Sequence, residues 1–269
     1  MRVATIMCIM RRDGFVTFCL KLVLMIPGIY SVATAMDQAT LRHEMVARNL
    51  AHTDIPGYRR AILRQQTFES AMSEASQKML RHDSLGVSSG GEDVDLTPGA
   101  FHRTNSPLDF AIQGNGYFVI EGPNGPLYTK NGAFQVNADG RLVTADGLPV
   151  AADSGSLTLP LNSSPSQLIV QSDGTAFVNG SEIGRIKLAQ FQNPHALISR
   201  GVTLFGAPDD ITPLDSDAQV IQGTRERSNV HPVQELVELI AASRAHDAAQ
   251  RAMRSLHDAI EHHTALQQG

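Results

Sequence analysis

The chain has 269 residues, a net charge of -5 and no tryptophan, and this length permits one large domain or two modest ones. The acidic charge is mild and spread along the chain, which argues against a nucleic-acid-binding protein. Both cysteines, Cys8 and Cys19, precede residue 25, so the remainder of the chain holds neither a disulfide framework nor a cysteine-based metal site.

Residues 1–24 differ from the sequence that follows, and two interpretations of them stay open. Two arginines precede a partly apolar run that is too short for an ordinary transmembrane helix. This pattern resembles a secretory signal peptide, with Ala33-Thr34-Ala35 as a small-residue cleavage site. The other interpretation is that translation starts at Met25 and that residues 1–24 are an upstream extension. We favour the extension, because cleavage after Ala35 would divide the helical pattern that follows.

An apolar heptad pattern predicts a helix that begins near Ile29 and ends near Ala51. Its steps alternate three and four residues, and the polar His43 within it is interpreted as a register-breaking or surface residue. The helix should end there because residues 52–57 are a turn signal. A polar helical stretch is predicted from about 61 to 80, and residues 81–93 resemble a flexible connection. The heptad positions are Ile29, Val32, Met36, Ala39, His43, Val46 and Leu50.

The connection contains a motif with catalytic form, G-x-S-x-G at residues 86–90. A nucleophilic Ser88 would need a strand before it and a helix after it, and neither is predicted. No Walker loop, dinucleotide fingerprint or H-E-x-x-H motif occurs. His257, Glu261 and His262 come nearest to a ligand cluster but are expected to be solvated on a polar helix face. We therefore predict no catalytic residues, no metal, no cofactor and no small-molecule substrate.

Residues 94–222 have the pattern of an all-β domain. Short runs rich in β-branched and aromatic residues alternate with Asn-Gly or Asp-Gly pairs, which are typical of turns between antiparallel strands because both central residues tolerate positive φ. The turn pairs begin at Asn115, Asn124, Asn131, Asp139, Asp146, Asp173 and Asn179. The predicted strands are 108–113, 117–121, 127–130, 133–136, 142–144, 156–159, 168–171, 176–178 and 183–192.

The C-terminal part, from Gly223 to about Leu266, predicts one long helix. Ser228 or Asn229 can cap its start, and Pro232 suits a first helical turn. An apolar, alanine-rich stripe recurs at helical spacing from Val233 onward. A helix of roughly 30 residues with so narrow a stripe is expected to need a partner, in its own chain or in another subunit.

Together these segments predict an α+β fold in which an all-β central domain of antiparallel hairpins is flanked by N- and C-terminal helices. The two helices are expected to pair in a coiled-coil-like axial domain and to pack on copies from neighbouring subunits. If these contacts run head to tail, they build an open helical assembly. The expected divisions are an N-terminal extension (1–24), an N-terminal axial segment (25–80), a linker (81–93), the β-domain (94–222) and a C-terminal axial segment (223–269).

Three blocks of the chain carry a resemblance to a known family: residues 25–31 with 47–60, residues 106–119 with 128–134 and 139–144, and residues 223–248. In this order they resemble the flagellar basal-body rod protein family, of the FlgF/FlgG type. Asn49-Leu50-Ala51 and Pro56-Gly57-Tyr58 are similar to the family's N-terminal signature, although Arg48 and His52 replace its usual asparagines and Ile55 its threonine. Residues 96–99, 106–109 and 183–188 look more like the proximal-rod than the distal-rod proteins.

The resemblance implies a structural protein of the flagellar basal-body rod, without catalysis, that spans the periplasm. Its terminal segments would be disordered in the free monomer, fold into helices on assembly and transmit torque through the axial tube. The implied partners are other copies of the chain, other rod and hook subunits and the flagellar type III export apparatus. A secreted β-domain binding module with helical stalks stays open as the alternative, and a hydrolase using Ser88 as the third possibility. The residues expected in subunit assembly are Ile29, Val32, Met36, Val46, Asn49, Leu50, Pro56, Gly57, Tyr58, Ser228, Asn229, Val230, Val233, Leu236, Val237, Ile240, Ala248 and Leu256.

Overall fold

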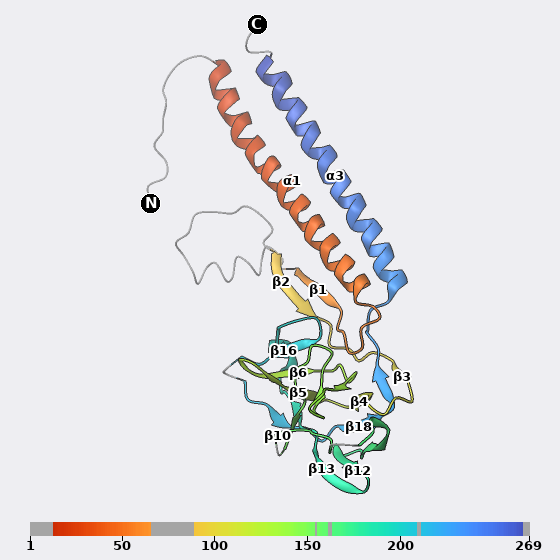
Figure 1. The fold of residues 1–269 in the computed structure, drawn as a ribbon. Helices are drawn as coiled ribbons and strands as arrows, with labels where there is room; N and C mark the ends of the chain where they lie inside the picture. Colours follow the sequence, from red (N-terminus) through yellow and green to blue (C-terminus); the bar gives the residue numbers. More distant parts are fainter. Residues whose placement is uncertain (1–12, 66–88, 154, 161–162, 209–210, 266–269) are drawn as a thin grey trace. The chain divides into compact units, whose positions relative to one another are not determined.

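The computed structural model describes residues 13–65, 89–153, 155–160, 163–208 and 211–265 (Figure 1). The chain forms two compact units. The first comprises Met1–Glu44, Leu63–Gly91 and Glu238–Gly269, and the second comprises Met45–Ile62 and Glu92–Val237. Ser88, most of the predicted helix over 61–80 and the start of the linker lie outside the described residues.

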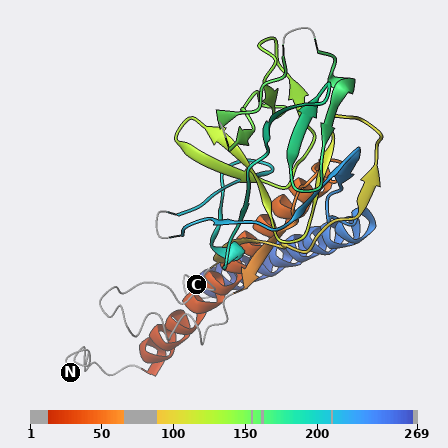
Figure 2. The same ribbon diagram turned by 90° about the horizontal axis from the view of Figure 1, so that it is seen from below.

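Two long helices run through the chain ends: α1, Asp13–Ala51, and α3, Pro232–Ala265. The end of α1 at Ala51 confirms the prediction from the turn signal. Within the first unit the helices lie side by side and antiparallel (Figures 1 and 2). None of the helices that the structure describes combines the length and apolar character that a membrane span requires.

Contacts between the two helices of the first unit are partly polar. Ala39 of α1 and Ala242 of α3 are buried, and small side chains allow helix axes to approach closely. The Arg42 guanidinium donates to Glu238 Oε2 at 2.6 Å, and Thr40 Oγ1 lies 3.4 Å from His246 Nδ1. His43 is exposed, as expected. Because the charged pair is itself largely exposed, it adds little stability, on the order of 0.5 kcal/mol.

The second unit is built from short antiparallel strands, which confirms the predicted α+β class. Its largest sheet has the order β15-β16-β6-β5-β14-β17, and a three-stranded sheet has the order β11-β12-β13. Two further pairings, β18 with β4 and β19 with β3, bring residues 219–226 back onto residues 101–113. The strands of the chain are β1 Ala61–Gln65, β2 Ser89–Val94, β3 Phe101–Arg103, β4 Phe110–Gln113, β5 Tyr117–Gly122, β6 Gly125–Thr129, β7 Gln135–Val136, β8 Leu142–Val143, β9 Ala151–Ala152, β10 Gly155–Ser156, β11 Leu168–Val170, β12 Thr175–Val178, β13 Ser181–Arg185, β14 Leu188–Gln190, β15 Ile198–Ser199, β16 Leu204–Gly206, β17 Leu214–Asp215, β18 Gln219–Gln222 and β19 Thr224–Glu226.

Strand β5 separates two apolar cores. Phe118 and Ile120 point into the main core, whereas Tyr117 and Val119 pack in a smaller cluster with Tyr128. This division follows from the alternation of side chains along a strand. Since both of its faces are covered, β5 has a continuous apolar run in its sequence rather than an alternating one.

The turns differ in detail from the prediction. Both central residues have positive φ only at Asn179 and Gly180 among the predicted turn pairs, all of which the structure describes. At residues 139 and 140 the glycine alone has positive φ, because Asn137 Oδ1 accepts hydrogen bonds from the Asp139 and Arg141 amides and forms the turn itself.

Two predictions for the residues on either side of 66–88 are wrong. Residues 61–65 form strand β1 rather than the start of a helix, and residues 89–93 belong to strand β2 rather than to a flexible connection. The two strands pair with each other, and the Asp95 amide donates to the Arg60 carbonyl at 2.8 Å just beyond them. The partner of each strand is distant in sequence, so local periodicity could not indicate the pairing.

Candidate assembly site

The two chain ends meet in the second unit at a polar cluster that we call the junction, defined by Asn49, Gly57, Tyr58, Arg59, Arg60, Glu226, Asn229 and Glu235. Asn49, in the last turns of α1, is fully buried. Its amide donates to the Ala61 carbonyl and its Oδ1 accepts from the Ala61 amide, both at 2.9 Å. The Tyr58 hydroxyl also donates to Asn49 Oδ1 at 3.0 Å. Asn49 therefore fixes the chain reversal between α1 and β1.

Gly57 is required by both conformation and space. Its φ of +68° is one that residues with a side chain rarely adopt. A Cβ there would lie 2.4 Å from the Asn131 nitrogen, which is backbone and cannot rotate away. The Gly57 amide donates to the Glu226 carbonyl at 2.8 Å, so this turn rests directly on the segment that leads to α3.

Arg59 and Glu226 form an ion pair in the interior of the junction. The Arg59 Nη2 donates to Glu226 Oε1 at 2.6 Å, and the two side chains are 2% and 1% exposed. The Gly99 amide donates to the same oxygen at 2.9 Å. A buried pair of this kind is sensitive to loss of one partner, because the other charge is then left without compensation.

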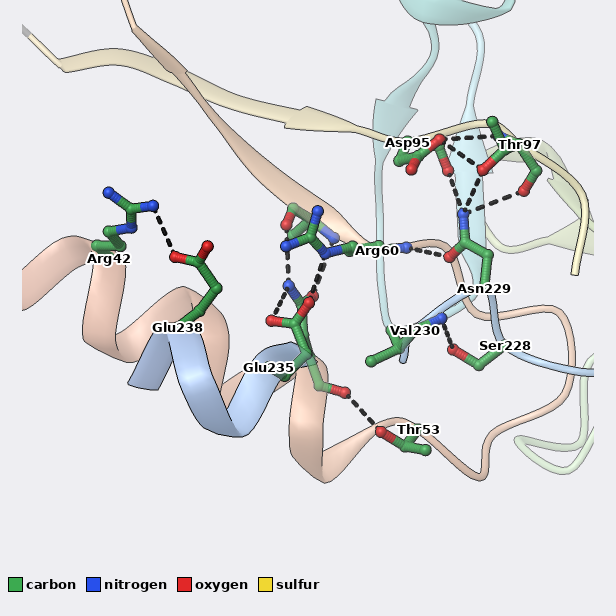
Figure 3. Close-up of polar contacts among 12 residues, drawn as sticks. Arg42, Thr53, Arg60, Asp95, Thr97, Ser228, Asn229, Val230, Glu235 and Glu238 are labelled. Atoms are coloured by element: carbon green, nitrogen blue, oxygen red, sulfur yellow. Dashed lines mark hydrogen bonds and ion pairs between the residues drawn. The ribbon is translucent and has the colours of Figure 1, made fainter. Parts of the chain in front are cut away.

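Arg60 and Glu235 connect the N-terminal turn to the first turn of α3 (Figure 3). Arg60 Nε donates to Glu235 Oε1 at 2.5 Å, and Asn49 Nδ2 lies 3.4 Å from Glu235 Oε2. Glu235 has no exposed surface. Glu235 lies in the first turn of α3, where the helix dipole favours a negative charge, and its burial against Arg60 and Asn49 adds a role that periodicity does not indicate.

The prediction that Ser228 or Asn229 caps α3 is wrong. The helix begins at Pro232, and its first backbone hydrogen bond runs from the Glu235 amide to the His231 carbonyl. Asn229 instead binds the opposite chain end: its Oδ1 accepts from the Arg60 amide at 2.7 Å, and its Nδ2 donates to the Asp95 carbonyl at 2.9 Å. Ser228 Oγ accepts from the Val230 amide within the same loop.

Burial shifts the pKa of two side chains in or beside the junction. Desolvation raises the pKa of Tyr58 above its usual value, with Arg48 opposing that shift. Desolvation also lowers the pKa of Lys130 to about 8, against the opposing influence of Glu226. No group of three or more His, Cys, Asp or Glu side chains suited to a metal ion occurs in the described part of the chain.

The residues expected in assembly divide by exposure. Asn49, Gly57, Tyr58, Val46 and Val230 are buried. Those on one face of α3 are open to solvent: Val233 is 76% exposed, Leu236 46%, Val237 62% and Ile240 55%.

The remaining predicted assembly residues have intermediate or full exposure. Ala248 is exposed, and the partly exposed residues are Ile29, Val32, Met36, Leu50, Pro56, Ser228, Asn229 and Leu256.

The prediction omitted the charged members of the junction, Arg59, Arg60, Glu226 and Glu235. A charged residue normally predicts a solvated position, and the partners of these four are separated from them by more than a hundred residues. One weak signal could have indicated a structural role for these four residues: they lie inside the blocks of sequence that resemble the family.

Fold and junction define a class: an α+β protein whose helical chain ends are tied to one β-domain by a shared polar cluster. Two family models match the chain. One, described as the flagellar hook protein FlgE/F/G D1 domain, covers residues 111–178, and the other, the flagellar basal body rod FlgEFG protein C-terminal region, covers residues 221–261.

Similar proteins extend the match to most of the chain. The flagellar basal-body rod protein FlgF of Rhizobium meliloti is 31% identical over 240 residues, which cover 87% of this chain and 96% of that protein. The FlgG protein of Agrobacterium fabrum is 32% identical over 237 residues, covering 80% and 89%. The FlgF protein of Salmonella typhimurium is 27% identical over 249 residues, covering 85% and 93%.

The chain therefore belongs to the flagellar basal-body rod protein family. It is a structural subunit of the rod in the flagellar basal body, and membership of this family implies assembly with other rod and hook subunits.

Proposed function

We propose that this chain is a FlgF-type, proximal-rod subunit that assembles through its terminal helices into the axial tube and transmits torque along it. The observation that carries the proposal is the apolar stripe on α3, formed by Val233, Leu236, Val237 and Ile240. These positions are three, four and seven residues apart and share one helix face. They are between 46% and 76% exposed, and contiguous apolar surface of this kind marks an interaction site.

The stripe can supply the free energy of a subunit contact. Fully burying one aliphatic side chain contributes about 1.5–3 kcal/mol, so four partly exposed ones give on the order of 4 kcal/mol at each repeat of the contact. Such a contact is weak between two free subunits and strong when many subunits repeat it. This property suits a protein that must travel as a monomer and assemble at its destination.

The partners in this proposal are other copies of the chain, neighbouring rod and hook subunits and the flagellar type III export apparatus. The proximal-rod assignment draws on residues 96–99, 106–109 and 183–188, and FlgF proteins are among the similar proteins. The role requires no catalysis. A Ser88→Ala variant should therefore leave motility unchanged.

The experiment compares two charge changes on α3. Val237→Glu places a carboxylate in the stripe, whereas Gln234→Glu adds the same charge at another exposed α3 position. Both variant proteins should fold, because neither position is buried. Cells with Val237→Glu should have truncated rods and no external filament in isolated basal bodies, and cells with Gln234→Glu should swim. Normal rods with Val237→Glu would contradict the proposal.

A further inference from the structure

A cleft in the second unit has properties that rod assembly through the helices does not use. Its volume is about 470 Å³, a size that holds a small organic molecule or two peptide side chains. Apolar groups form much of its wall, among them Phe101, Ile112, Tyr117 and Phe191. Two cations, Arg59 and Lys130, also line it.

Arg59 presents a hydrogen-bond donor for which the described residues supply no acceptor. The residue is 4% exposed, and its Nη2 is used by Glu226. Its Nη1 is buried and has no hydrogen-bond partner among the described residues. Buried donors in proteins are nearly always satisfied, so this atom indicates a place for an acceptor from outside the described part of the chain.

Lys130 adds a second incompletely used donor group. It is 8% exposed, its Nζ donates to the Gly114 carbonyl at 3.1 Å, and it lies 5.2 Å from the centroid of the Tyr117 ring. An ammonium group has three N–H donors. The bond to Gly114 occupies one of them, which leaves capacity to bind an anion inside the cleft.

The charged residues that line the cleft determine which ligand charge fits best. Among the described residues that line the cleft, the charged ones are Arg59, Lys130 and Glu226, which together carry a net charge of one positive unit when Lys130 is protonated. A single negative charge balances this set. A dianion such as phosphate would be repelled by the Glu226 carboxylate beside the donors.

We infer that this cleft binds a monocarboxylate carried on an apolar group, with the carboxylate at Arg59 and Lys130 and the apolar group against Tyr117 and Phe191. A planar carboxylate accepts well from both guanidinium and ammonium donors. The aromatic walls bury the remainder of the ligand. The same chemistry has two possible sources: a carboxylate side chain on a neighbouring rod or hook subunit, or a free organic acid.

Binding should depend on pH through Lys130. Burial lowers the pKa of Lys130 to about 8, with Glu226 raising it and Arg59 lowering it further. Tyr117 on β5 also lines the cleft, and burial raises the pKa of its hydroxyl, so this group stays neutral in this range. As pH rises past about 8, the ammonium is lost and the affinity for a carboxylate should fall.

The probe is N-acetylphenylalanine, and its uncharged amide is the matched control ligand. Titration of the full-length protein by NMR at pH 7 should show saturable binding of the acid, with the amide binding at least about tenfold more weakly, as expected for loss of charge-assisted hydrogen bonds. Lys130→Met should weaken binding of the acid by a similar factor. Lys187→Met makes the same charge change at an exposed position outside the cleft lining and should leave it unchanged.

Three results would overturn the inference: no saturable binding of the acid, equal binding of acid and amide, or equal binding to wild type and Lys130→Met. Ligand binding is measured on the isolated protein, so its failure would not affect the proposed rod function, and failure of rod assembly would not affect it. A saturating concentration of the acid then separates the sources. Blocked association with other rod or hook subunits identifies a protein carboxylate, and unchanged association identifies a free organic acid.

Discussion

Asp109 offers a sharp test of what stabilises the β-domain, because its carboxylate lies just before β4 and pairs with Arg225 of β19, which is far away in the sequence. It is 1% exposed. The Arg225 Nη2 lies 2.7 Å from its Oδ1, and the Thr104 hydroxyl donates to its Oδ2 at 2.5 Å. The Gly223 amide donates to its backbone carbonyl at 2.7 Å. The isosteric change Asp109→Asn removes the charge and keeps the backbone contact.

The expected loss is about 2 kcal/mol. The Arg225 contact is an ion pair without hydrogen-bond geometry, since Asp109 Oδ1 has no hydrogen-bond partner among the described residues. The Arg225 side chain is 38% exposed, so solvent screening holds the contribution of this pair to about 1 kcal/mol. The Thr104 bond is less screened, although its hydroxyl can rotate toward the asparagine oxygen, and it contributes roughly another 1 kcal/mol. At a slope of about 2 kcal/mol per molar urea, the unfolding midpoint should fall by about 1 M.

The assay is urea unfolding of the full-length protein, followed by far-UV circular dichroism and tyrosine fluorescence. Asp146→Asn, at an exposed turn position, makes the same chemical change and should move the midpoint very little. In a double-mutant cycle with Arg225→Met, the coupling should be about 1 kcal/mol. The reasoning fails if Asp109→Asn and Asp146→Asn unfold at the same urea concentration, or if the cycle shows no coupling.

Three further changes test the junction and the cleft. Gly57→Ala should abolish stable rod assembly in motility and basal-body assays, because its Cβ would lie 2.4 Å from the Asn131 nitrogen; a swimming strain would contradict this. Asn49→Asp should destabilise the junction by about 2 kcal/mol or more in assembled rods at neutral pH, since a carboxylate would face both the Ala61 carbonyl and Glu235 at 3.4 Å. Asn49→Asp rods as resistant to heat at neutral pH as wild type would refute this. Burial lowers the pKa of Lys130 to about 8 from the ordinary value of 10.5, so between these pH values the unfolded chain binds more protons than the folded one. The free energy of unfolding should therefore rise with pH across that window by about 3 kcal/mol. Urea unfolding should show this rise in wild type relative to Lys130→Met, and the comparison cancels the titration of the tyrosines, which both proteins share.

The parts of the fold that local patterns control were predictable. The end of α1 follows from a turn signal directly after Ala51, and the hairpin between β12 and β13 follows from Asn179-Gly180, where both residues have positive φ. The strands β4, β5 and β11 carry dense apolar runs and coincide closely with the predicted ranges. In each case the residues that determine the structure are neighbours in the chain.

Long-range pairing accounts for most of what was missed. Strand β19 pairs with β3 across more than a hundred residues, and its sequence Thr-Arg-Glu contains no apolar run. Its stability comes from partners such as Arg59 and Gly99, which converge on Glu226. Long-range contacts also explain the error at Asn229, which as a short polar residue ahead of a helix fits a cap. Its side-chain amide instead accepts a hydrogen bond from the Arg60 amide and donates to the Asp95 and Thr97 carbonyls.

The family-like residues therefore perform two separable tasks. Asn49, Gly57 and Tyr58 are buried and bind within their own chain, whereas Val233 and Val237 present most of their surface to solvent. A substitution in the first group should disturb the subunit itself, and one in the second should leave the subunit intact and disturb only its assembly. A structural protein needs both tasks, so family-like residues can serve either one, and resemblance alone does not separate them. Burial separates them, because a side chain already enclosed in its own chain has no surface left to contact another.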